Sequence, residues 1–295
     1  MSETDTFGFL PIPRTITFDR GAAEPLPTLS SDIASVLHHL THRDGYRYAP
    51  QEYDPAIEVF EPRGGQTERP AHLHKMPSSH VLRLDAPLAE TAKPFRLGDG
   101  AFLIQFIGLM SGYRLQFEDW WFDGRLPMFP RRWRFLLPHE LETRLLSGAY
   151  KAWRGWASPE RMRYTNLLYM HVRSATYKWD WERFTVNYMV LDGCYKMALR
   201  LNLVPKINRH RERLPRMLQA FGMPLHADAE KIVGFRNDLF HETLWDEGQP
   251  GTGSRTGPKY ADHLSRINDR LLFALAGYSG PYLSSAWWDI GQAPM

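Results

Sequence analysis

The chain has 295 residues, of which 43% are hydrophobic and 23% charged, and its formal net charge is +3. This composition is typical of a globular protein that can bury a sizeable core. The small net charge excludes a polybasic nucleic-acid-binding chain, so any basic site must be local. A single cysteine, Cys194, lies in an apolar stretch and excludes an intrachain disulfide framework or a cysteine-based zinc site; we expect a buried thiol.

The sequence shows no sign of export or of membrane insertion. The first residues, 1–5, lack the basic and apolar regions of a signal peptide. The longest apolar run, Ala101 to Met110, is too short to span a bilayer. We therefore expect a cytoplasmic protein without a membrane partner.

The first half of the chain favours strands. Residues 31–41 predict a short helix, capped by Ser31 or Asp32. Between residues 45 and 135, glycines and prolines separate short β-favourable runs, namely Ala56 to Phe60, His80 to Leu84, Phe102 to Leu109 and Tyr113 to Phe117. Ser111-Gly112 is suited to a hairpin turn between the last two. Phe102 to Leu109 also fits a buried helix, because periodicity does not settle short apolar runs.

From about residue 138 the hydrophobic period becomes helical. Ser158 is suited to an N-cap followed by Pro159 in the first turn. Asp228 is suited to cap the helix that carries Arg236. The residues from Asp246 to Lys259 have the composition of an exposed loop. The predicted helices are 138–154, 160–174, 181–203, 212–221, the one after Asp228, and 259–277.

The segment 181–203 is the longest of these helices. Asp192, Lys196 and Arg200 recur at spacings of four, so they can pair along one face, and Pro205 ends the pattern. An apolar stripe follows another face, through Phe184, Tyr188, Leu191, Tyr195, Ala198 and Leu201. The change of period, somewhere in 136–165, predicts an α+β fold with a β-rich N-terminal domain, 1–150, and a helical domain, 151–295.

The most informative stretch is Arg-Asn-Asp-Leu-Phe-His, residues 236–241. On a helical projection, Arg236 falls in the middle of an apolar arc that predicts a core helix. Asn237 and His241 lie at the edge of this arc. The angle between Arg236 and His241 is about 140°. An unpaired buried charge costs several kcal/mol. We therefore expect an anion opposite Arg236: a carboxylate, a partner chain or a phosphate.

This stretch has two interpretations. A histidine beside a fixed cation can act as a general acid or base near neutral pH, and an arginine binds phosphate through two parallel contacts. Arg236 and His241 then suit phosphodiester cleavage without a metal, with Asn237 orienting the imidazole or a phosphate oxygen. Alternatively, Arg236 pairs inside the protein with Asp192 or Glu230, and His241 is an ordinary surface residue.

The pattern formed by Arg236, Asn237 and His241 resembles the signature of the HEPN superfamily: an arginine, a polar residue, and a histidine four to six positions after the arginine. The segments 181–203 and 206–221 look like the ApeA-type branch found in prokaryotic antiviral systems. The helical resemblance covers about residues 165–280. Phe102 to Pro127 is also similar to the β-rich N-terminal region of such proteins.

The resemblance implies an all-α HEPN-type bundle that pairs into a homodimer, with two such motifs facing each other across the symmetry axis. Active members cut RNA without metal: the 2′-hydroxyl attacks the adjacent phosphate, the residue corresponding to His241 is the acid or base, and that corresponding to Arg236 stabilises the charge on phosphorus. Other members only bind RNA or nucleotides. We take the active site to be a composite of two chains, because Arg236 and His241 project apart on one helix.

Other groups are weaker candidates. The basic residues Lys206, Arg209, His210, Arg211, Arg213 and Arg216 suit an RNA backbone, and Lys206, Arg209, Arg211 and Arg213 are our candidate RNA-binding set; a solvated face explains them as well. A second cluster places Arg125, Arg131, Arg132 and Arg134 among Phe129, Trp133 and Phe135, which fits single-strand binding but better fits strands that pack a core.

The histidines His38, His39, His42, His72, His74 and His80 are more consistent with a polar loop than with a metal site, since no carboxylate follows at a telling spacing. The phosphate-binding loop, the zinc-protease helix and the serine-hydrolase elbow are all missing from the sequence. We therefore predict no cofactor and no metal.

The sequence as a whole predicts a metal-independent RNA endonuclease that acts as a toxin or antiphage abortive-infection effector. Arg236, Asn237 and His241 are the expected catalytic residues, and the expected partners are RNA, a second copy of the chain, and an antitoxin or phage-derived trigger. Two alternatives stay open: a non-catalytic module that holds RNA or a nucleotide through the same residues, and a structural assembly subunit.

Overall fold

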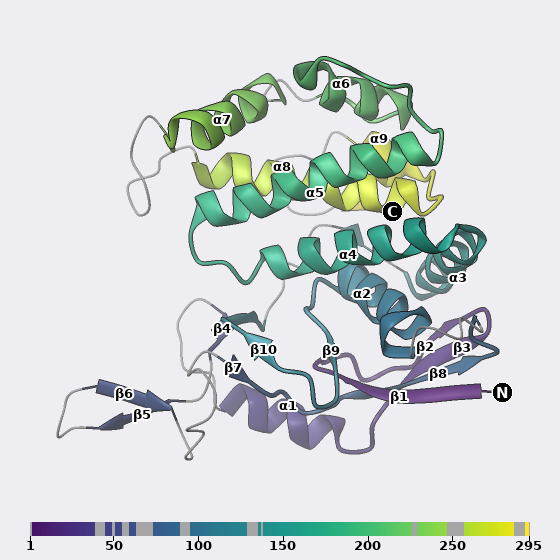
Figure 1. The fold of residues 1–295 in the computed structure, drawn as a ribbon. Helices are drawn as coiled ribbons and strands as arrows, with labels where there is room; N and C mark the ends of the chain where they lie inside the picture. Colours follow the sequence, from purple (N-terminus) through teal and green to yellow (C-terminus); the bar gives the residue numbers. More distant parts are fainter. Residues whose placement is uncertain are drawn as a thin grey trace. The chain divides into compact units, whose positions relative to one another are not determined.

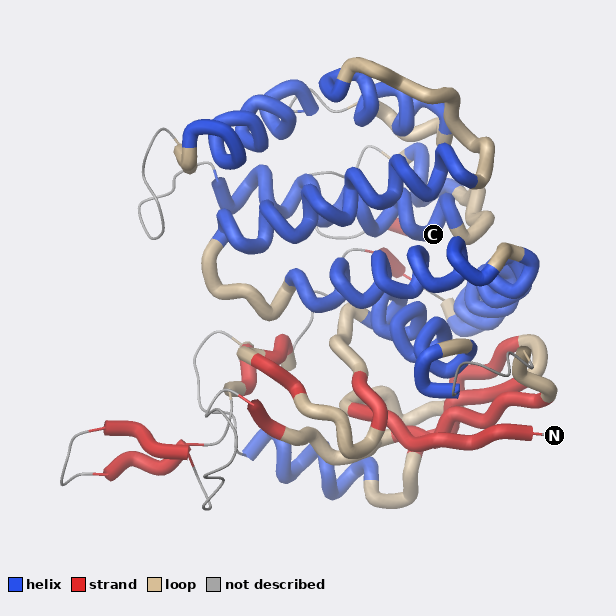
Figure 2. Tube along the Cα trace, viewed as in Figure 1, coloured by secondary structure: helices blue, strands red, loops and turns tan. Residues whose placement is uncertain are grey.

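The computed structural model describes residues 2–38, 45–48, 51–54, 59–62, 73–88, 95–128, 135–136, 138–225, 229–246, 257–285 and 293–294. The chain divides into two compact units, one formed by residues 1–104 and 111–130 and the other by residues 105–110 and 131–295. The first is rich in strands and the second in helices (Figures 1 and 2). The predicted α+β class is confirmed.

The first unit contains an antiparallel sheet whose strands follow the order β2 (Ile16–Phe18), β3 (Gly21–Pro25), β8 (His80–Asp85), β1 (Ser2–Gly8) and β9 (Gln116–Phe117). Strand β8 alternates between buried and more exposed side chains, with Leu82 and Leu84 inaccessible to solvent. This alternation is what a strand with one face on a core requires. The strand predicted over His80 to Leu84 is thus confirmed.

The rest of the unit consists of short elements. Helix α1 (Leu29–His38) contributes Val36 to a buried cluster with Phe9, Phe122, Leu126 and Met128. Three strand pairs complete it: β4 (Tyr46–Arg47) with β11 (Leu126–Pro127), β7 (Leu73–His74) with β10 (Phe122–Asp123), and β5 (Gln51–Asp54) with β6 (Val59–Pro62). A short 3₁₀ turn, η1, covers Phe95–Leu97. Of the strand predicted over Ala56 to Phe60, only the end from Val59 is among the described residues.

Helix α2 (Asp99–Ser111) confirms the buried helix, the second of the two structures that the sequence allowed for Phe102 to Leu109, and excludes the strand. Every residue from 102 to 110 is buried, so the run shows neither helical nor strand periodicity. Gly112 follows at a φ of +75°, which suits the residue after a helix end. The hairpin turn predicted at Ser111-Gly112 is therefore wrong, and only the end of the next predicted strand is extended.

The first turn of α1 also differs from the prediction. The helix begins at Leu29, so Ser31 and Asp32 lie inside its first turn rather than at the cap. The Ser31 hydroxyl donates a hydrogen bond to the Thr28 carbonyl at 2.7 Å. Side chains of this kind compete for backbone groups anywhere near a helix start, which explains the error.

The second unit is a set of packed helices: α3 (His139–Gly155), α4 (Ser158–Ser174), α5 (Asp180–Arg200), α6 (His210–Ala220), α7 (Ala229–Glu242), α8 (Gly257–Leu275) and α9 (Pro281–Ser284). A short parallel pair, β12 (Phe135–Leu136) with β13 (Ala293–Pro294), belongs to it too. Helices α5 and α8 pack along their lengths, with α4 on one side and α6 and α7 on the other (Figure 1).

Several predicted helix ends move by a few residues. Ala157, not Ser158, occupies the cap position before α4. Helix α5 stops at Arg200, five residues before Pro205. Helix α8 begins at Gly257, so the loop predicted up to Lys259 ends earlier; residues 247–256 and Asp228 lie outside the described residues.

The stripe on α5 is confirmed for five of its six residues, since Phe184, Tyr188, Leu191, Tyr195 and Ala198 are buried and Leu201 is half-buried beyond the helix end. Cys194 is also buried, as expected, and burial raises the pKa of its thiol.

The ion pairs predicted along α5 are wrong. Arg200 pairs with Glu160 of α4 at 2.7 Å, and Asp192 pairs with groups on α6. Contacts between helices have replaced the contacts expected within one helix.

The first unit ends at residue 130, before the boundary that was predicted in 136–165. Residues 105–110 of α2 are an exception, since they belong to the second unit. Among the described helices, none combines the length and apolarity that crossing a membrane requires.

Candidate functional site

Helix α7 holds the three predicted catalytic residues. Only its first half packs into the core, where Ala229, Ile232 and Val233 are buried. Its second half lies at the surface: Phe240 is 45% exposed, and Asn237 and His241 are exposed. The core helix expected from the apolar arc is therefore wrong for the second half, and this is the half that carries the motif.

The structure brings Arg236, Asn237 and His241 together within one chain. The Arg236 Nη1 group lies 2.8 Å from His241 Nε2 and 3.1 Å from Asn237 Oδ1. The Cα atoms of Arg236 and His241 lie far apart around the helix axis. The arginine side chain is long enough to extend along the helix surface and reach the histidine ring. The expectation that their angular separation keeps Arg236 and His241 apart on one helix is therefore wrong, and the composite site of two chains stays a prediction.

The contact fixes the state of the imidazole nitrogen. An arginine guanidinium has only N–H donors. His241 Nε2 must therefore accept, and it carries a lone pair rather than a proton in this arrangement. That is the form in which a histidine can take a proton from a substrate.

Aromatic rings, not a carboxylate, accompany the Arg236 guanidinium. Its Cζ lies 5.2 Å from the centre of the Phe240 ring and 6.0 Å from that of Tyr188. Within the described part of the chain, Arg236 forms no ion pair, and its Nε has no hydrogen-bond partner. Cation–π contacts replace the anionic partner that the sequence predicted, and the charge remains available to an anion.

Tyr188 of α5 connects this group to α6. Its ring stacks on His210, with 5.9 Å between ring centres and 22° between planes, and also contacts Phe240. Tyr188 is almost fully buried; burial raises the pKa of its phenol, the nearby Asp192 adds to this rise, and Arg236 and Arg213 oppose it. The phenol therefore stays neutral, and its ring contacts both the Arg236 guanidinium and the His210 imidazole.

Asp192 explains why Arg236 lacks a carboxylate. Its Oδ1 lies 3.3 Å from His210 Nε2 and 3.9 Å from Arg213 Nη1. The Asp192 carboxylate thus contacts His210 and Arg213 of α6, so the alternative in which Asp192 pairs with Arg236 is wrong.

The predicted RNA-binding residues divide into two groups. Lys206, Arg209 and Arg211 are exposed, although Arg209 also pairs with Glu212 at 3.4 Å. Arg213 turns inward, with its Cζ 5.1 Å from the Tyr195 ring centre, as well as toward Asp192. The first three residues form an exposed basic edge on and before α6, which packs against α7.

The other candidate clusters do not form sites among the described residues. His74 and His80 are both buried on strands, so the polar loop predicted for them is wrong; His39, His42 and His72 lie outside the described residues. Arg125 lies 3.9 Å from the centre of the Tyr46 ring, and its predicted neighbours, 129–134, lie outside the described residues. The part of the chain that is described brings no three potential metal ligands together.

Comparisons with family models, with curated proteins and with solved structures gave no match for this chain. The resemblance to HEPN proteins accordingly remains a proposal that depends on the motif and its geometry.

Two members of the site escaped the sequence reasoning as parts of one cluster. Tyr188 was recognised only as one residue of a core stripe, and His210 only as one of several basic residues. They meet because α6 folds back along α5, a contact between residues 22 positions apart that no local pattern encodes.

Proposed function

We propose that the chain is an RNA endonuclease of the HEPN type whose active centre is Arg236, Asn237 and His241. The observation that carries the proposal is the 2.8 Å contact between Arg236 Nη1 and His241 Nε2 at an exposed helix end. A cation without a carboxylate partner among the described residues and a histidine nitrogen that accepts a hydrogen bond are the two groups that support metal-independent phosphodiester cleavage.

The proposed chemistry follows from these roles. His241 accepts the proton of a 2′-hydroxyl, whose oxygen forms a bond to the adjacent phosphorus while the bond from phosphorus to the 5′-oxygen breaks. Arg236 moves a hydrogen bond from His241 to a phosphate oxygen and stabilises the charge that develops there. Asn237 holds the guanidinium through its amide oxygen. The products are a 2′,3′-cyclic phosphate and a 5′-hydroxyl.

The proposal includes a homodimer. Apolar side chains lie exposed beside the motif: Phe240 on α7 and Leu244 just after it are each about half exposed, at 45% and 48%. Contiguous exposed apolar groups beside a polar site are typical of an interaction surface. A second copy at this surface brings a second His241 to act as the acid that protonates the leaving oxygen.

The biological role proposed with this activity is that of a cytoplasmic toxin or antiphage abortive-infection effector. An endonuclease that attacks cellular RNA requires restraint, so an antitoxin or a phage-derived trigger completes the proposal. The exposed basic residues Lys206, Arg209 and Arg211 support RNA as the substrate, because a local basic edge binds phosphates in a chain of low net charge.

Cleavage of a labelled single-stranded RNA in the presence of a chelator tests the activity. We expect Arg236→Ala and His241→Ala each to lower the rate at least about 100-fold. Glu242→Gln, an exposed neighbour on the same helix, is the matched control and should cleave like the wild type. Equal cleavage by all four proteins would contradict the proposal, because the activity would then come from a contaminant or another site.

The non-catalytic alternative makes a different prediction in the same experiment. A binding module retains RNA with a strong salt dependence and loses it on Arg236→Ala, but forms no product. A filter-binding titration at two salt concentrations, run beside the cleavage assay, distinguishes the two.

A further inference from the structure

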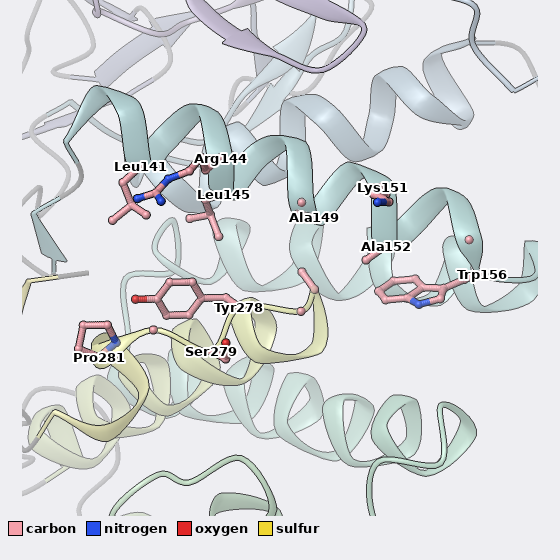
Figure 3. A pocket seen from close by; sticks show the side chains of 15 residues that line it. Leu141, Arg144, Leu145, Ala149, Lys151, Ala152, Trp156, Tyr278, Ser279 and Pro281 are labelled. Carbon is pink, nitrogen blue, oxygen red and sulfur yellow. The ribbon is translucent and has the colours of Figure 1, made fainter.

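A groove runs along helix α3, away from the motif on α7. It has a volume of about 820 Å³ and lies between α3 and the turn that joins α8 to α9 (Figure 3). Leu141, Leu145 and Trp156 line the α3 side, and Tyr278 and Pro281 line the opposite side. No acidic residue is among those that line it.

The α3 side of the groove has heptad spacing. Leu141, Leu145, Gly148, Ala152 and Gly155 follow one another at intervals of four, three, four and three residues. Alternation of this kind places side chains along the seam on which a second helix packs knobs into holes. The described part of the chain puts no helix on this seam, and the groove is the hollow left beside it.

Two cations flank the seam at equivalent heptad positions. Arg144 and Lys151 are exposed, seven residues apart, and neither forms a hydrogen bond or ion pair with another described residue. Seven residues of helix rise about 10.5 Å, so the two charges repeat at the interval of a helix that packs alongside. Flanking positions of this type form salt bridges between helices.

Gly148 shows that the α3 backbone is open to close approach. A glycine inside a helix costs about 1 kcal/mol relative to alanine. A Cβ atom at Gly148 would meet nothing within 4 Å, and the same is true at Gly155. Packing in the described structure therefore does not require either glycine, and the missing side chains leave room for a second helix to approach the α3 backbone.

We propose that this groove is the docking surface for an amphipathic helix of a partner protein, one with an apolar stripe flanked by acidic residues at heptad spacing. The groove volume also suits a small ligand. Three features favour a helix over a small ligand. They are the heptad spacing, the two cations two turns apart, and Gly148 between them, which has no side chain. Charge complementarity then requires acidic flanks. This proposal is independent of the RNA endonuclease activity.

A synthetic three-heptad peptide with leucine in the seam and glutamate at the flanks is a direct probe. Repulsion between the glutamates keeps it from pairing with itself at neutral pH. We expect it to bind the full-length chain in fluorescence anisotropy, and Arg144→Glu/Lys151→Glu to weaken the binding at least tenfold. The matched control is Arg163→Glu/Lys196→Glu, which makes the same change in net charge on α4 and α5 and should bind normally.

Two further measurements complete the test. A peptide with lysine in place of glutamate should prefer the Arg144→Glu/Lys151→Glu protein, and Gly148→Leu should block the acidic peptide by filling the hollow, while circular dichroism checks that each variant folds. Indifference to the charge reversal, or no binding by either peptide, overturns the proposal. Binding of pyrophosphate or AMP that depends on Arg144 and Lys151, without peptide binding, identifies a small-anion site and also overturns it.

Discussion

Two histidines of the helical unit, His171 and His241, show how differently the same side chain is used. His171 on α4 is buried, whereas His241 on α7 is exposed. The partner of His171 is a carboxylate, with 2.6 Å between its Nε2 and Asp269 Oδ1, and the partner of His241 is the cation of Arg236. His171 faces oxygen atoms within the core and joins helices, whereas His241 lies at the surface with its Nε2 beside the Arg236 guanidinium.

The buried pair belongs to a network that leaves it little freedom. His171 Nδ1 lies 3.1 Å from Asn187 Oδ1, and the Asn187 amide nitrogen donates to the Arg183 carbonyl, which fixes the amide orientation. Both ring nitrogens of His171 therefore lie within hydrogen-bond distance of side-chain oxygens. The buried contact between His171 and the Asp269 carboxylate, together with Asn187, joins α4, α5 and α8.

The largest effect we predict comes from breaking this pair. His171→Ala removes the imidazole that lies 2.6 Å from the buried Asp269 carboxylate, and removal of one member of a buried pair costs about 3–5 kcal/mol. His241→Ala, at an exposed position, should change the free energy of unfolding by less than about 0.5 kcal/mol. Urea unfolding followed by circular dichroism measures both.

The pair of variants also tests the comparison itself. If the distinction holds, His171→Ala loses stability, and His241→Ala loses RNA cleavage without losing stability. Equal stability losses in both would show that His241 supports the fold, and the site proposed on α7 would lose its basis.

The next largest effect concerns a third histidine, His80 of the strand-rich unit, which is buried without a carboxylate partner among the described residues. Burial lowers its pKa to about 4, although hydrogen bonds with the carbonyls of Ile12 and Arg14 oppose the shift. In the unfolded chain its pKa returns to about 6.5. Below pH 6.5 the unfolded state therefore binds a proton at His80, whereas the folded state binds it only below about pH 4.

Stability from this group is fully present above pH 6.5 and falls as the pH drops to 4, by up to about 3 kcal/mol for a shift of this size. Urea titrations at pH 7 and pH 4.5 measure the loss, and His80→Asn, which cannot titrate in this range, should reduce it. A pH dependence unchanged in the variant would assign the loss to other groups.

The candidate site was only partly predictable from the sequence. The order Arg236, Asn237, His241 was sufficient to select this helix end as a candidate site, because the motif is local. The direct contact between Arg236 and His241 was not predicted, since a helical projection places Cα atoms and ignores the reach of an arginine side chain. Tyr188 and His210 were missed as neighbours because α6 packs on α5 only through tertiary structure.

The fold divides in the same way. Helices with a clear apolar stripe, such as α3 and α5, were predicted to within a few residues. For helix α2 the sequence left a strand and a buried helix open, because residues buried on all sides carry no periodic signal. Local capping patterns misled at Ser31 and Ser158, where the hydroxyl residue lies inside the helix that it was expected to cap.

A smaller effect distinguishes buried from open helix surface in the same unit. Gly193 of α5 lies against α4, and a Cβ atom there would come within 2.3 Å of the Leu167 side chain. Leu167 is itself buried and must repack. We expect Gly193→Ala to lower the free energy of unfolding by about 1–3 kcal/mol, the usual cost of overpacking. A stability equal to the wild type would show that this contact between helices adjusts freely.

The smallest effect has the opposite sign and comes from the open surface of α3. Gly148 lies inside the helix at a position where a Cβ atom meets nothing within 4 Å. Gly148→Ala should therefore raise the free energy of unfolding by up to about 1 kcal/mol through helix propensity alone. The same substitution thus has opposite effects at Gly193 and Gly148, measurable by urea unfolding of the two variants in parallel. Destabilisation by Gly148→Ala would mean that α3 is already covered at this point, and that the groove beside it is closed in the free protein.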